Sequence, residues 1–212
     1  MSASAVPEDE VLVLYDEGVE AYALLAGDLT TEGWARPACG DWDVTQLTRH
    51  VAAVAAWYHA WLDRAERGEA TPPFSAQQLA AQNELALVAL AETSGPAALE
   101  LFVTRARSYR DRLPAAWDLA YGYPRGTVTA GLHAAVAACE WHLHAWDLAR
   151  SSGSGHRPTD PEALYRGAGS CLSKAQGGLK GRIASTLIPL GARLSPWEAL
   201  LRRSGRAPGP ED

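Results

Sequence analysis

Three side chains on two predicted helices have the types and spacing of a metal-binding set. Glu140 and His144 lie one helical turn apart, in an i, i+4 row with Leu132 and Val136. His50 lies on the apolar stripe of an earlier predicted helix. A glutamate on an apolar row is costly to bury unless it is paired or bound to a metal. Two histidines and one carboxylate can hold a divalent ion and leave coordination positions open.

Asp147 lies three residues after His144, near the same face of the predicted helix. Its carboxylate could accept a hydrogen bond from the free ring N–H of a metal-binding histidine, a contact that orients the ligand. Asp147 could instead pair with Arg150 at i+3. An inward-facing histidine is also more often a core residue than a ligand, so spacing alone leaves a core role open for this group.

Three other histidines are placed less favourably for the same ion. His142, two residues from Glu140, faces the opposite side of its helix, and His59 points away from His50. His133 shares the face of Glu140 but lies about 10 Å away along the helix axis. We therefore expect His133 to line a cavity at most, and His142 and His59 not to contact the ion.

The elements that must position these side chains are helices almost throughout. Apolar residues recur at three-to-four spacing, and capping boxes open several of the segments. Thr127 is the expected cap of the long helix that carries the glutamate. The glycine- and proline-rich segments 30–42 and 114–126 are predicted loops, and 176–194 has no assignment. The predicted helices cover about residues 7–25, 43–66, 75–92, 97–113, 127–150, 160–174 and 195–204.

Long amphipathic helices joined by short loops are typical of an antiparallel helix bundle. We therefore predict an all-α fold in which residues 1–152 form a four-helix bundle that carries the metal site. Residues 153–212 are predicted to be a short helical extension packed on this bundle.

Composition excludes several classes of protein. The 212 residues carry 19 basic and 25 acidic side chains, a net charge of −6 that argues against a nucleic-acid partner. No apolar run is long enough for a membrane span, and the N-terminal residues lack the pattern of a signal peptide. Three cysteines do not suggest a disulfide framework, so we expect a cytoplasmic protein. For the oligomeric state we expect either a monomer or a homodimer. The strong bias toward arginine over lysine suggests GC-rich, actinobacterial codon usage.

Two segments resemble a known family. Residues 39–50, CGDWDVTQLTRH, match the pattern C-x-x-W-x-V-x-x-L-x-x-H, and residues 140–150, EWHLHAWDLAR, match E-x-x-x-H-x-W-D-L-A-R. The tail 195–208 is a weaker match. Both patterns are typical of mycothiol-dependent maleylpyruvate isomerase-like proteins of the DinB-like metalloenzyme superfamily, which the chain resembles over most of its length.

The resemblance implies a DinB-like four-helix bundle with a divalent metal on His50, Glu140 and His144. Zinc is the commonest ion in this family, and nickel, iron and manganese are alternatives. The implied cosubstrate is mycothiol, and the implied activity is that of an isomerase or S-transferase acting on a small electrophile through a metal-bound thiolate. The founding isomerase has a further α/β domain at its C-terminus. Residues 151–212 are too short and too helical for it, which argues against maleylpyruvate itself.

Five side chains are candidates for orienting the carboxylates of a substrate or the hydroxyls of the thiol. The two arginines among them could equally be solvated surface charges. Two other functions stay open: a hydrolase in which the metal activates water, and a ligand-binding bundle without catalysis. The five candidates are Arg49, Trp57, Arg105, Tyr121 and Tyr123.

Overall fold

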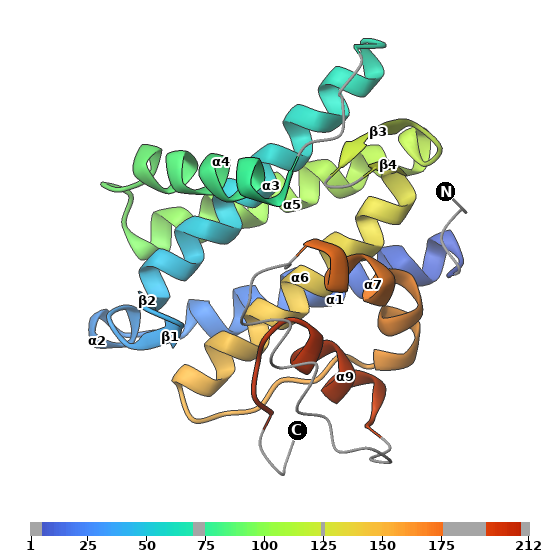
Figure 1. Ribbon diagram of the computed structural model, residues 1–212. Helices are drawn as coiled ribbons and strands as arrows, with labels where there is room; N and C mark the ends of the chain where they lie inside the picture. Colours follow the sequence, from blue (N-terminus) through green and yellow to red (C-terminus); the bar gives the residue numbers. More distant parts are fainter. Residues whose placement is uncertain (1–5, 70–74, 124–125, 176–193, 209–212) are drawn as a thin grey trace.

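Four long helices form the body of the computed structural model, which describes residues 6–69, 75–123, 126–175 and 194–208. The all-α prediction is confirmed, since helix dominates these residues. The first and last of the four helices pack along each other, and so do the middle two (Figure 1). In chain order they are α1 (Glu8–Gly27), α3 (Val44–Glu66), α5 (Gly95–Ala116) and α6 (Ala130–Ser151).

Four shorter helices complete the described part of the chain. Residues 176–193, within the segment left unassigned from the sequence, lie outside it. Among the described helices, none is both long enough and apolar enough to cross a bilayer. The shorter helices are α2 (Thr31–Trp34), α4 (Ala76–Ala89), α7 (Pro161–Ala175) and α9 (Pro196–Arg203).

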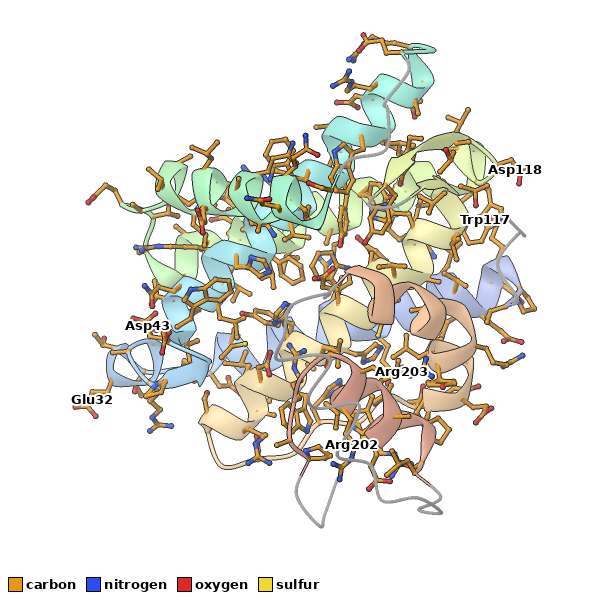
Figure 2. All side chains as sticks on the ribbon, in the orientation of Figure 1. Glu32, Asp43, Trp117, Asp118, Arg202 and Arg203 are labelled. Atoms are coloured by element: carbon orange, nitrogen blue, oxygen red, sulfur yellow. The ribbon has the colours of Figure 1, made fainter. Side chains whose placement is uncertain are left out.

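Side-chain caps start α3, α4 and α9 where the sequence predicts. Figure 2 labels Asp43 at the start of α3. Its side chain accepts from the backbone N–H of Gln46, whose side chain accepts in return from the Asp43 N–H. Ser75 and Ser195 form the same reciprocal caps at α4 and α9. Gly205, at φ 83°, follows the last turn of α9.

Two short hairpins replace parts of the predicted loops. β1 (Pro37–Cys39) pairs with β2 (Trp42–Asp43), and β3 (Ala120–Tyr123) pairs with β4 (Gly126–Thr129), both antiparallel. The expectation that Thr127 caps the long helix is therefore wrong. Threonine and valine at 127–129 favour an extended strand, so the cap falls two positions later, on Thr129.

α6 is the central helix. Every residue from 130 to 149 is buried except Glu140, so this helix has apolar neighbours on all sides rather than along one stripe. α1 covers one side of it, and α7 packs on both α6 and α1. α9 packs on α7 and buries Trp197 completely. The helix with two of the candidate ligands is thus held in place over its whole length.

Candidate metal centre

The structure brings His50 from α3 together with Glu140 and His144 from α6. One donor atom from each lies within 4.8 Å of the other two. That spacing is close to the span of two metal–ligand bonds of about 2 Å each. Both histidines are almost fully buried, and their ring centroids are 5.2 Å apart at an angle of 77°. The three side chains therefore form one compact donor set between two helices of the bundle.

The state of His50 fits a metal ligand. Its Nδ1 atom is buried and has no hydrogen-bond partner among the described residues. Burial, with the neighbouring His144 and Arg206 adding to it, lowers the pKa of His50 to about 3. A neutral imidazole with an unpartnered buried nitrogen is what metal coordination requires.

The other two candidate ligands are each oriented by a neighbour. Tyr58 donates its hydroxyl hydrogen to Oε2 of Glu140 at 2.8 Å, which leaves Oε1 for another partner. Nδ1 of His144 lies 3.0 Å from Oδ2 of Asp147. This contact turns the Nε2 atom of His144 away from Asp147 and leaves it for an ion.

Arg206 is a residue of this site that the sequence does not single out. Its Nε atom donates to Oδ1 of Asp147 at 2.8 Å, and its Nη2 atom donates to Oδ2. Burial alone would raise the pKa of Asp147, but the hydrogen bonds from His144 and Arg206 lower it to about 2. The only signal was its place in the weakly matching tail, just after the glycine that ends α9.

Cys39 belongs to a second group of possible donors, which shares His144 with the first. Its sulfur, a ring nitrogen of His144 and a carboxylate oxygen of Asp147 lie within 4.8 Å of one another. The guanidinium of Arg206 already binds Asp147 there, so this group has its cation. Burial raises the pKa of the Cys39 thiol to about 11, and the charge of Asp147 adds to that effect, so the thiol stays protonated at neutral pH.

Two of the five predicted substrate or cofactor contacts, Trp57 and Tyr123, line a small cavity together with Glu140. The other three have partners elsewhere. Arg49 donates to the backbone oxygen of Thr93 at 2.7 Å, and Arg105 donates to that of Ala52 at 2.8 Å. Arg49 therefore joins α3 to the loop before α5, and Arg105 joins α5 to α3. Their roles toward a ligand stay predictions.

Tyr121 belongs to a buried cluster around His133, whose ring packs against the cavity residues Tyr58, Trp61 and Tyr123. Its hydroxyl lies 2.5 Å from Nδ1 of His133, and the hydroxyl of Tyr109 lies 3.1 Å from the same atom. The two histidines expected to face away have other partners as well. Nε2 of His142 bonds to the backbone oxygen of Leu14, and Nε2 of His59 bonds to that of Arg105.

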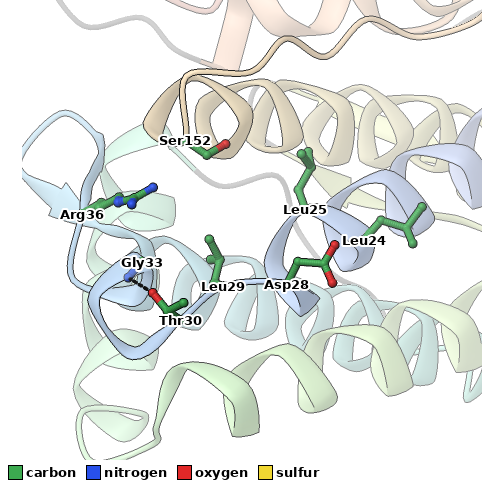
Figure 3. Close-up of a pocket in the computed structure, with 8 residues that line it drawn as sticks. All are labelled: Leu24, Leu25, Asp28, Leu29, Thr30, Gly33, Arg36 and Ser152. Carbon is green, nitrogen blue, oxygen red and sulfur yellow. Dashed lines mark hydrogen bonds between the residues drawn. The ribbon is translucent and has the colours of Figure 1, made fainter.

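A larger open pocket of about 440 Å³ lies at the end of α1 (Figure 3). Thr30 and Gly33 in its wall are joined by the 3.3 Å hydrogen bond that caps α2. Its charged lining residues are Asp28 and Arg36, and none of the three candidate ligands contributes to it. The chemistry suggested by the donor set therefore belongs to the smaller cavity beside Glu140.

Comparison with known proteins identifies the class. Residues 15–149 match the model of the mycothiol maleylpyruvate isomerase N-terminal domain family. The match covers well over half of the chain and includes His50, Glu140, His144 and Asp147. The chain belongs to this family.

Two solved structures share the fold. The crystal structure of the mycothiol-dependent maleylpyruvate isomerase superposes with a TM-score of 0.61 at 21% identity, covering 82% of this chain and 71% of that one. A histidine-to-alanine mutant of the same enzyme gives a TM-score of 0.61 at 20% identity with the same coverage. Among curated proteins, none matches the chain significantly.

Proposed function

We propose that this protein is a divalent-metal-dependent isomerase or S-transferase that uses mycothiol and acts on a small electrophilic substrate. The observation that carries the proposal is the convergence of donor atoms from His50, Glu140 and His144 within 4.8 Å. Membership of the family and the two mycothiol-dependent structural neighbours support mycothiol as the cosubstrate.

The donor set fits zinc or a similar divalent ion, which would lower the pKa of a coordinated thiol. The surrounding residues have separate tasks. Tyr58 holds the carboxylate of Glu140, and Asp147 holds His144 in one ring orientation. Arg206 balances the charge of Asp147. Cys39, protonated at neutral pH, does not compete with the cosubstrate as a nucleophile.

Addition of the thiol to the substrate can lead either to an isomer or to a stable adduct. The sulfur of mycothiol forms a bond to the β-carbon of an activated alkene, and the electron pair of the double bond moves toward the activating carbonyl group. If the carbon–sulfur bond then breaks after rotation, the double bond re-forms with the other geometry and the thiol is released. If the bond stays, the thiol proton ends on the α-carbon and the product is an adduct.

Elemental analysis of purified protein tests the metal site. We expect about one divalent ion per chain, loss of the ion in His144→Ala, and affinity about 10–100-fold weaker in Asp147→Asn. His59→Ala and His142→Ala, checked by circular dichroism for an intact fold, should keep the ion. Loss of the ion in His142→Ala with retention in His144→Ala would show that the metal site lies on the other face of α6, and would contradict the proposal.

Turnover of an α,β-unsaturated ketone, with and without mycothiol, tests the cosubstrate. We expect product only when both the thiol and the ion are present, and none in His144→Ala. Hydrolysis of an amide or ester that needs the ion but no thiol would replace this proposal by a hydrolase.

A further inference from the structure

A small cavity of about 30 Å³ lies between α3 and α4 and reaches Glu140. Its wall is strongly aromatic. Trp57, Tyr58 and Trp61 from α3 line it, with Tyr123 from β3. Flat aromatic walls favour planar apolar groups, which stack on them or meet them edge to face. The cavity therefore has the lining of a binding site for a planar group next to the donor set.

The polar groups of this cavity suit a neutral ligand. The Nε1–H of Trp57 is buried and has no hydrogen-bond partner among the described residues. A buried N–H without an acceptor is unfavourable, so an oxygen on a ligand would satisfy it. The amide of Asn83 also lines the cavity. Of the described lining residues, only Glu140 carries a charge, and that charge is negative.

α4 forms the most loosely packed wall of the cavity. It contributes Leu79 and Asn83, and none of its described side chains is buried. Its main packing partner is α3. A cavity of this size holds about one water molecule, so a larger ligand requires part of the wall to move, and α4 is the part with no buried side chain among its described residues. Few buried contacts oppose that movement.

We propose that this cavity binds the apolar part of an uncharged, planar α,β-unsaturated carbonyl compound, whose carbonyl oxygen accepts from Nε1 of Trp57. The inference rests on the proposed function, because it places the electrophile beside Glu140. It distinguishes this chain from an enzyme for dicarboxylates, which need cationic side chains in addition to the ion, because none of the described lining residues is an arginine or lysine. Arg49 and Arg105, the predicted carboxylate contacts, donate instead to backbone oxygens of Thr93 and Ala52.

Binding without turnover tests the ligand class. Benzylideneacetone, an uncharged aryl enone, and fumarate, a dicarboxylate, are titrated into the full-length protein without thiol, and tryptophan fluorescence is followed. We expect saturable binding of the enone and at least about 10-fold weaker binding of fumarate. Equal or tighter binding of fumarate would overturn the proposal.

Trp57→Phe isolates the hydrogen bond, because it keeps an aromatic wall and removes the N–H. We expect affinity for benzylideneacetone to fall about 3–10-fold, the loss of one hydrogen bond, with no fall for 1-phenyl-1-butene, which lacks the carbonyl. An equal fall for both ligands, or no fall for the ketone, would contradict the assigned contact.

Two aspartate substitutions on α4 form a matched pair. Leu79 lines the cavity, whereas Leu85 is 70% exposed on the same helix. Leu79→Asp should weaken binding of the enone more than about 10-fold, and Leu85→Asp should not change it. Equal effects would remove the cavity from the proposal. If the protein binds the enone but shows no thiol-dependent turnover, the proposed function is refuted and the ligand-binding proposal for the cavity stands.

Discussion

At the scale of single residues, Tyr58 fixes one oxygen of Glu140 from the neighbouring helix. Tyr58→Phe removes this hydrogen bond and keeps the ring, so we expect divalent-metal affinity to fall about 10–100-fold in chelator competition. Tyr15→Phe is the matched control, because Tyr15 is buried and its hydroxyl donates to the backbone oxygen of Ala106 rather than to a candidate ligand. Equal metal affinities in both variants would show that the Tyr58 contact is only structural.

The Arg206–Asp147 pair makes a sharper prediction about stability. Arg206→Met leaves the carboxylate of Asp147 buried without its cation, so the free energy of unfolding should fall by about 3–5 kcal/mol. Adding Asp147→Asn should recover much of this loss. Arg203→Met on the nearby α9 is the control. It removes a guanidinium that lies over the ring of Tyr165, and it should cost no more than about 1 kcal/mol. Urea denaturation measures the wild type, the single variants Arg206→Met, Asp147→Asn and Arg203→Met, and the double variant. Additive losses in the double variant would contradict a coupled pair.

His133 links stability to pH. Burial lowers the pKa of His133 to about 3, whereas the unfolded chain binds this proton below about pH 6.5. The unfolded state therefore holds the extra proton between these values. As pH falls through this window, His133 alone should reduce the free energy of unfolding by up to about 1.4 kcal/mol per pH unit. In the metal-free protein, urea denaturation from pH 7 to pH 4 should show a shallower slope for His133→Gln. Parallel slopes would contradict a neutral, buried His133.

The sequence predicts the residues of the candidate site better than their partners. Glu140 and His144 share a face because they are one turn apart, and His50 lies on the apolar stripe of another helix. The resemblance adds the pairing between the two helices. Arg206 lies 59 positions from Asp147, and Tyr58 lies 82 positions from Glu140. No local pattern encodes contacts over such separations, since they arise only when the helices pack.

At the scale of elements, α1 and α6 approach closely at Gly18. A Cβ atom there would lie 2.9 Å from Cβ of Trp141 and 3.2 Å from Cδ2 of His142. Gly18→Ala should therefore destabilise the protein by about 1–3 kcal/mol, although alanine favours helix. Gly27→Ala on the same helix meets no atom within 4 Å and should be neutral or stabilising. Thermal denaturation compares the two, and a stabilised Gly18→Ala would contradict the close approach.

Helix starts were predictable because their signals are local, as the capping boxes at Asp43, Ser75 and Ser195 show. The β3–β4 hairpin was not. Its strands are only four residues long, and their glycines, with the proline between them, have the composition of a loop. Pairing between Tyr121 and Val128 defines these strands, and that pairing leaves little trace in periodicity.

At the scale of the whole molecule, we infer that residues 153–212 act as an extension of the bundle formed by residues 1–152. α7 contacts α6 and α1, and Trp197 of α9 is fully buried. Amide hydrogen exchange tests this arrangement. We expect α6 and α9 to exchange at the rate set by global unfolding, and α4 to exchange much faster. Rapid exchange in α9 with slow exchange in α6 would show that the extension opens independently.

The position of Arg206 also has a consequence for synthesis of the protein. All three candidate ligands precede it, and it follows Asp147 by 59 residues. At roughly 5–20 residues per second, the ribosome adds Arg206 several seconds after Asp147. During that interval the carboxylate that orients His144 lacks its arginine. The nascent chain therefore contains His50, Glu140 and His144 before it contains the arginine that balances the charge of Asp147. The site reaches its final geometry only after the C-terminal segment has been synthesised.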